Sequence, residues 1–229
     1  MLYIISAVIL LVLYALTIRY MTLMRKTRLW NAIFTVLIFS YYIYVAVTVY
    51  RSVGFNDWNF KNVLPVANVS PFMFTLVPLI HLLPMKVKKH FYLLISLLSI
   101  GMLLSAILGC IYNASINYKF HVHFLSDYLA HVFLSLWGVY LVKSGQVSLT
   151  KKNCLISSSI IIGSALCMLI LNLIFDTSFF GLSLRGKHNI YNNVLTESSY
   201  LSALLYFVGL SGVLGLGYLY SRLLSKKAS

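Results

Sequence analysis

The chain has 229 residues, of which 60% are hydrophobic and only 10% are charged. Soluble domains carry about 25% charged residues, so this composition excludes a water-soluble globular protein and indicates an integral membrane protein. The formal net charge of +14 does not indicate nucleic acid binding, because the basic residues lie in short loops between apolar segments, where they set topology and meet anionic headgroups.

Seven apolar segments approach or exceed the length needed to cross a membrane, which is about 20 residues. We therefore predict an all-α polytopic membrane protein, in which residues 1–229 form a single transmembrane domain with a bundle of seven transmembrane helices. The predicted spans are residues 2–18, 29–50, 63–84, 91–112, 124–143, 154–175 and 199–221.

Lysine and arginine alternate between the two sides of this predicted bundle. The loops after the first, third and fifth spans and the C-terminal tail each carry at least three of them, whereas every other loop carries at most two. Cytoplasmic loops are enriched in Lys and Arg, so the pattern predicts an outside N-terminus and a cytoplasmic C-terminus. We expect a multi-pass protein of the plasma membrane, and the abundance of Ile, Lys and Asn is typical of a low-GC bacterium.

The third segment contains all four prolines of the chain, and two of them, Pro71 and Pro78, lie well inside it. They are seven residues apart and share one helical face. Each removes a backbone donor and clashes with the preceding turn. We therefore predict a third helix kinked by proline. Such a helix either lines a cavity or bends only to pack against its neighbours.

The fifth segment has the clearest pattern of polar residues. Asp127, His131 and Ser135 recur every four residues, on one helical face. A carboxylate at this spacing can hold one ring nitrogen of the histidine and raise the basicity of the other, as in a general base or a proton relay. The structural alternatives are that Asp127 caps the helix and that His131 bonds a neighbouring helix. No metal site is predicted, because His121 and His123 alone make a weak ligand set.

Further polar residues are predicted to outline an outward-facing pocket among the third, fifth and sixth segments. The loop after the sixth segment, residues 177–198, is the longest and contains a basic stretch. Its side chains meet either a lipid phosphate or only solvent. The predicted substrate-binding residues are Asn68, Asn172, Asp176, Arg185 and Lys187.

Small residues at four-residue spacing predict where helices approach closely. The fourth segment has Gly101, Ser105 and Gly109, and the seventh has Ser211 and Gly215.

Short matches within residues 63–215 resemble a known family. They are Leu64-Pro65 in the third segment, His123-Phe124 and Ala130-His131 in the fifth, the run Asn172 to Asp176, and Ser183 and Lys187 in the following loop. On these residues the chain resembles the YwaF-type integral membrane family. That family is related to the animal transmembrane acyltransferase that transfers polyunsaturated acyl chains to ether phospholipids.

The resemblance implies a site made by a cysteine on the third helix and a histidine on the fifth. His131 stands at the matching histidine. The corresponding window of the third segment, residues 65–70, contains no cysteine, because the three cysteines are Cys110, Cys154 and Cys167. Ser70 is the only nucleophile in that window, and a serine needs more activation than a thiol.

Three interpretations of the function stay open on these residues, and so does the question of whether the chain is an enzyme. The first is a lipid-modifying, acyltransferase-like protein with Ser70 as nucleophile, His131 as base and Asp127 orienting the base. The second is a small transporter in which the broken third helix and the Asp127–His131 pair couple to protons. The third is a binding or accessory subunit without enzymatic activity. We expect membrane lipids as partners and no cofactor, and each interpretation is compatible with a homo-oligomer or a membrane protein partner.

Overall fold

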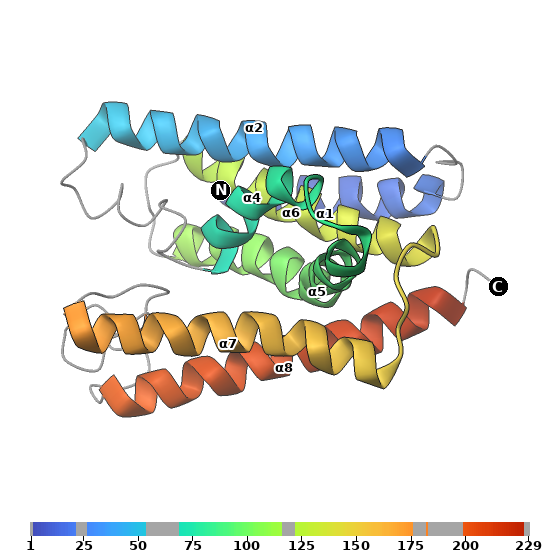
Figure 1. Ribbon diagram of the computed structural model, residues 1–229. Coiled ribbons are helices and arrows are strands. Elements are labelled where there is room, and N and C mark those ends of the chain that lie inside the picture. Colours follow the sequence, from blue (N-terminus) through green and yellow to red (C-terminus); the bar gives the residue numbers. More distant parts are fainter. Residues whose placement is uncertain are drawn as a thin grey trace.

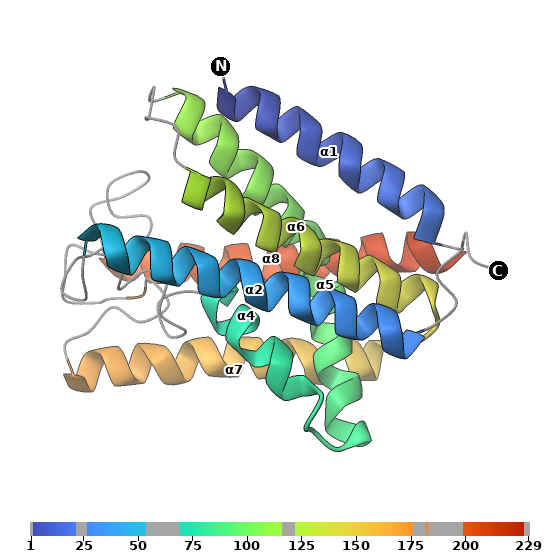
Figure 2. The same cartoon turned by 90° about the horizontal axis from the view of Figure 1, so that it is seen from above.

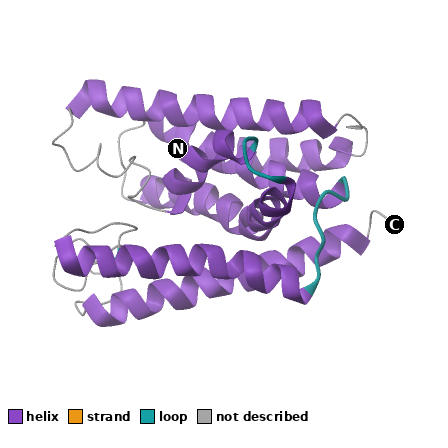
Figure 3. Cartoon of the chain, viewed as in Figure 1, coloured by secondary structure: helices purple, strands orange, loops and turns teal. Residues whose placement is uncertain are grey.

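The computed structural model describes residues 2–21, 27–53, 69–115, 122–175, 182 and 199–226. All the regular secondary structure of this described part is helical, and the two connections that it includes, between α4 and α5 and between α6 and α7, are short (Figure 3). The helices are α1 Leu2–Tyr20, α2 Thr27–Val53, α4 Val69–Ile80, α5 Met85–Ser115, α6 Val122–Lys143, α7 Lys151–Phe175 and α8 Ser199–Lys226.

Six of these helices, all except α4, are long and apolar enough to cross a membrane. This confirms the all-α class and the multi-pass membrane character predicted from the sequence. The helix bounds also agree closely with the predicted spans, because runs of apolar residues about 20 long leave few other solutions in lipid.

The third predicted span is the exception. Within its described part the helix runs only from Val69 to Ile80, and 12 residues rise about 18 Å, which is less than the roughly 30 Å hydrocarbon core. The helix stops because Pro84 restricts the residue before it. The carbonyl of Pro84 then accepts bonds from Val87 N and Lys88 N, at 3.0 and 2.9 Å, and so starts α5. Pro84 therefore lies between the end of α4 and the start of α5.

The two inner prolines of this segment have different surroundings. Pro71 lies in the first turn of α4, where its missing N–H has no partner to lose, whereas Pro78 lies inside the helix. The hydroxyl of Thr75, between the two prolines, donates to the carbonyl of Pro71 at 2.9 Å. Pro65 lies outside the described residues.

The helices are arranged around α5. In Figure 1, α2 lies above α4 and α6, and α7 and α8 form the opposite layer. α5 packs against α1, α4, α6, α7 and α8. At 31 residues it is about 46 Å long, so it must tilt to fit the membrane, and Figure 2 shows it crossing α2, α7 and α8 obliquely.

Two glycines allow the closest approaches to α5. A Cβ on Gly138 of α6 would lie 2.7 Å from the carbonyl oxygen of Ile95, and one on Gly217 of α8 would overlap the carbonyl oxygen of Leu97. Neither glycine belongs to the small-residue patterns read from the sequence. Of those patterns, Gly101 meets Val213 tightly, as predicted, whereas a Cβ on Gly215 would meet no atom within 4 Å.

We predict that Gly217→Ala destabilises the bundle, because the added methyl group requires α8 to move away from backbone atoms of α5. Overpacking of this kind costs about 1–3 kcal/mol. Thermal unfolding in detergent should show a clear fall in the melting temperature. The matched control is Gly215→Ala on the same helix, which should leave the melting temperature unchanged or slightly raised. Equal effects of the two substitutions would contradict this packing.

Candidate functional site

The hydroxyl of Ser70 and the imidazole of His131 meet between α4 and α6. Ser70 Oγ lies 2.9 Å from His131 Nε2, although the residues are 61 positions apart in the chain. Ser70 is the second residue of α4, and His131 lies nine residues into α6. The histidine side chain is only 7% exposed, whereas Ser70 is half-buried.

The second ring nitrogen fixes the tautomer of this histidine. His131 Nδ1 lies 2.8 Å from the backbone carbonyl oxygen of Asp127, one turn earlier in α6. A carbonyl oxygen can only accept a hydrogen bond, so Nδ1 carries the proton. In the neutral ring, Nε2 then presents its lone pair, and the hydroxyl of Ser70 donates to it. This is the arrangement that a general base needs.

The carboxylate of Asp127 lies farther from the imidazole than the main-chain carbonyl of the same residue does. Its Oδ1 lies 3.7 Å from His131 Nδ1, which is beyond hydrogen-bond distance, and its side chain is 37% exposed. The expected orienting bond is therefore made by the main chain of Asp127.

Two apolar side chains complete the surroundings of the pair. Phe74 lies one turn after Ser70 on the same face of α4, and its ring meets the imidazole edge-on with centroids 5.1 Å apart. Met102 of α5 lies on the other side, with its sulfur 3.8 Å from Ser70 Oγ. The Ser70 hydroxyl can also donate to this sulfur, which is a weak acceptor.

The third residue of the α6 pattern points elsewhere. Ser135 donates to the hydroxyl of Tyr14 at 3.0 Å, and that hydroxyl lies 3.2 Å from the hydroxyl of Tyr220. This chain of hydroxyls joins α6 to α1 and α8. Ser135 therefore holds the bundle together at a place separate from the Ser70–His131 pair.

The predicted substrate-binding residues fall into two groups. Asn172 is buried on α7 and donates to the backbone carbonyl of Leu182. α7 packs against α5 and α8, whereas the serine and histidine lie between α4 and α6. The other four, Asn68, Asp176, Arg185 and Lys187, lie outside the described residues, so their place in the pocket stays a prediction.

The sequence interpretation missed a second polar network. Trp137 Nε1 donates to Asn31 Oδ1 at 2.9 Å, and Asn31 Nδ2 donates to Gln146 Oε1 at 2.7 Å. The backbone carbonyl of Asn31 accepts from the hydroxyl of Thr35, which lies 2.7 Å from Nε2 of His81. The signal was available: a single amide in a long apolar segment and a buried tryptophan both need polar partners.

No metal site is formed within the described part of the chain, where no three His, Cys, Asp or Glu side chains gather. His121 lies outside this part, and His123 lies at a position whose side chain is not described. The described cysteines are also away from the pair: Cys110 lies on α5, and Cys154 and Cys167 lie on α7.

A comparison of the chain with protein-family models, with curated proteins and with solved structures finds no match. The chemistry of the site is therefore argued from its own geometry.

We predict that Nδ1 of His131 carries a proton and that Nε2 accepts the hydrogen bond from Ser70. Nitrogen NMR of the protein labelled in its histidine rings can measure this, with the His131 signals assigned by their loss in His131→Gln. Ser70→Ala should shift the Nε2 signal, because that atom loses its donor. Ser157→Ala is a matched control, since Ser157 lies 3.2 Å from Nδ1 of His90 instead. A neutral ring with its proton on Nε2 would contradict the arrangement.

Proposed function

We propose that this integral membrane protein is a serine–histidine enzyme that cleaves or transfers an acyl ester of a membrane lipid. The observation that carries the proposal is the 2.9 Å contact between Ser70 Oγ and His131 Nε2, with Nδ1 held by a carbonyl. A serine next to a base whose second nitrogen is fixed by a third group is the usual arrangement of an activated nucleophile.

The start of α4 supplies a second element that such a reaction needs. The first four N–H groups of a helix have no partner within it. The described part of α4 begins at Val69, and Pro71 has no N–H, so we propose the N–H groups of Ser70 and Phe72 as the donors. Together with the positive end of the helix dipole, they are suited to stabilise an oxyanion that forms on a carbonyl attacked by Ser70.

In the proposed reaction, Ser70 Oγ attacks the ester carbonyl carbon, and the proton of the Ser70 hydroxyl passes to His131 Nε2. The bond from the carbonyl carbon to the leaving oxygen breaks, and that oxygen takes the proton from the imidazole. Water or the hydroxyl of an acceptor lipid then attacks the acyl-serine and loses its proton to His131. The bond from the acyl carbon to Ser70 Oγ breaks, and Ser70 Oγ takes this proton from His131.

The location favours a lipid as the substrate. The residues around Ser70 in the first turn of α4 are half-buried rather than enclosed, and α4 packs chiefly against α2. A half-buried serine beside apolar helices suits an ester carried by a lipid. The resemblance to the YwaF-type family points to the same chemistry, with serine in place of the cysteine. Arg185 and Lys187 are proposed to hold the lipid phosphate.

The orientation is also part of the proposal. The ends of α1, α6 and α8 and the starts of α2, α5 and α7 gather at one end of the bundle, on the right of Figure 2. The lysine- and arginine-rich loops attach there, so we assign this end to the cytoplasm and the N-terminus to the outside of the plasma membrane. Ser70 lies near the start of α4, at the other end of the bundle, so in this orientation it faces the outer leaflet.

One observation favours a non-catalytic alternative, namely a binding or accessory subunit. His131 is nearly fully buried and both of its ring nitrogens have partners, as in a histidine that only fastens two helices. A transporter is less well supported by the described residues. The experiment below separates the enzyme from the accessory subunit.

We predict that a long-chain alkyl fluorophosphonate labels the purified protein on Ser70. The label should be absent in Ser70→Ala. Labelling should be slowed at least about 100-fold in His131→Ala, which lacks the base. Asp127→Asn should slow labelling much less, because the main-chain carbonyl holds Nδ1. Ser157→Ala is the matched control, since it removes another serine that contacts a histidine, and it should label like the wild type.

Folding of each variant is checked by its thermal unfolding. A folded wild-type protein that resists the probe, or labelling that survives Ser70→Ala, would assign the Ser70–His131 contact to structure alone. A membrane-impermeant fluorophosphonate applied to intact cells should also label Ser70, and labelling only after the cells are opened would reverse the proposed orientation.

A further inference from the structure

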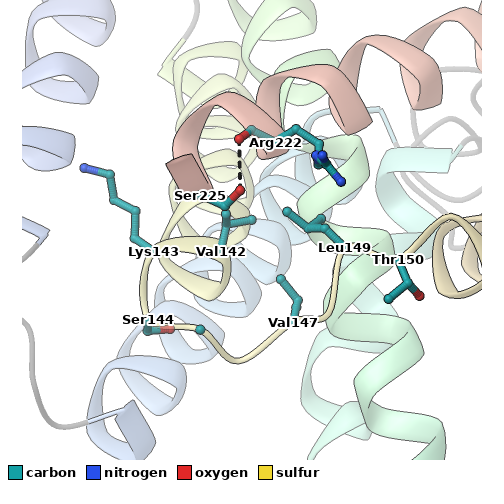
Figure 4. Close-up of a pocket in the computed structure, with 9 residues that line it drawn as sticks. Val142, Lys143, Ser144, Val147, Leu149, Thr150, Arg222 and Ser225 are labelled. Atoms are coloured by element: carbon teal, nitrogen blue, oxygen red, sulfur yellow. Dashed lines mark hydrogen bonds between the residues drawn. The ribbon is translucent and has the colours of Figure 1, made fainter. Parts of the chain in front are cut away.

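A second candidate site lies at the other end of α6, about 18 Å along the helix from His131. There the α6–α7 loop and the last turns of α8 surround a pocket of about 570 Å³ (Figure 4). One part of its wall is apolar, from Val142, Val147 and Leu149. The rest is mainly polar or basic, and none of the described residues that line it is acidic.

The loop that forms this pocket is held in one shape. Gly145 lies in the turn that follows α6 and has a φ of 69°. Gly145 N donates to Val142 O at 3.1 Å and Gln146 N donates to Leu141 O at 3.0 Å, which together close the helix end. The side chain of Gln146 is then fixed by Asn31 of α2. The wall of the pocket is therefore formed before any ligand arrives, which lowers the entropic cost of binding.

The charge in the pocket comes from Arg222 of α8. Its guanidinium carbon lies 5.9 Å from the centre of the Tyr218 ring. In Figure 4 the guanidinium extends toward Thr150, at the start of α7. Lys143 also lines the pocket, but it points away and donates to the carbonyl of Ile18 at 3.2 Å. Arg222 is thus placed to receive an anion, and its planar group suits a phosphate.

The position of the pocket along the helices indicates which kind of phosphate compound it binds. α6 ends at Lys143 and α7 begins at Lys151, so the pocket lies where the helices leave the hydrocarbon core. Exposed Lys151 and Lys152 flank it. We infer that this pocket binds the phosphate of an anionic phospholipid, with Arg222 on the phosphate and Val142, Val147 and Leu149 against the glycerol and upper acyl carbons. A soluble phosphate ester has the same phosphate but no acyl chains.

The inference is independent of the acyl-ester chemistry proposed for Ser70. It concerns a different end of the bundle and needs no reaction.

Native mass spectrometry of the protein in an uncharged detergent can test it, with phosphatidylglycerol and phosphatidylcholine as the added lipids. The wild type should bind phosphatidylglycerol more tightly than phosphatidylcholine. Arg222→Gln should weaken the binding of phosphatidylglycerol about fivefold. Lys89→Gln is the matched control, because Lys89 is an exposed lysine of α5 that does not line the pocket.

A second pair of variants covers the case in which Arg222→Gln fails to fold. Ser225 lines the pocket and its hydroxyl bonds only the nearby carbonyl of Arg222, at 2.9 Å. Ser225→Glu should weaken phosphatidylglycerol binding. Ser225→Gln, whose side chain has the size of glutamate but no charge, should not. Glycerol phosphate, added as a competitor at the lipid concentration, should displace little lipid.

Three results would overturn the inference. One is phosphatidylglycerol binding that Arg222→Gln and Ser225→Glu leave unchanged. Another is an equal loss in Lys89→Gln, which would indicate diffuse charge rather than a pocket. The third is that glycerol phosphate displaces bound phosphatidylglycerol as effectively as added lipid does, which would assign the pocket to a soluble phosphate ester.

Discussion

Within the hydrocarbon core no water is available to pair with a polar side chain, so each one must find its partner inside the bundle. This constraint organises the described structure. Asn31 and Trp137 join α2 to α6, the Ser135, Tyr14 and Tyr220 hydroxyls join three helices, and Asn113 of α5 donates to Tyr128 of α6 at 2.6 Å. The Ser70–His131 contact belongs to the same set, but it alone places a nucleophile against the free lone pair of an imidazole whose other nitrogen is fixed.

Most of the fold could be predicted from the sequence because it depends on local properties. Long apolar runs leave a helix as the main solution in lipid, so the bounds of six helices follow from hydropathy. The end of α4 at Ile80 was harder to see, since Leu82 and Leu83 beyond it are as apolar as the leucine before it. The contacts of Gly138 and Gly217 were missed for another reason. Each glycine meets a backbone carbonyl of another helix, and such a contact leaves no spacing pattern in the sequence of the helix that carries the glycine.

The candidate site was predictable in part. Four-residue spacing placed Asp127 next to His131, but spacing cannot distinguish the main-chain carbonyl from the carboxylate, and the carbonyl makes the bond. Ser70 was chosen through a resemblance, and its contact with His131 depends on how α4 packs beside α6, 61 residues later in the chain. Phe74 and Met102, which enclose the pair, carry no signal that separates them from other apolar residues.

The central claim is that Ser70 is a nucleophile and not only a fastening between α4 and α6. Acyl transfer through Ser70 must pass through an acyl ester on that oxygen. The most direct measurement is therefore mass spectrometry of the Ser70 peptide from protein stopped in acid while it consumes a phospholipid. The account predicts an acyl ester on Ser70 that disappears when the lipid is exhausted. Phospholipid turnover without acyl-Ser70, or no turnover by folded protein in lipid, would contradict it.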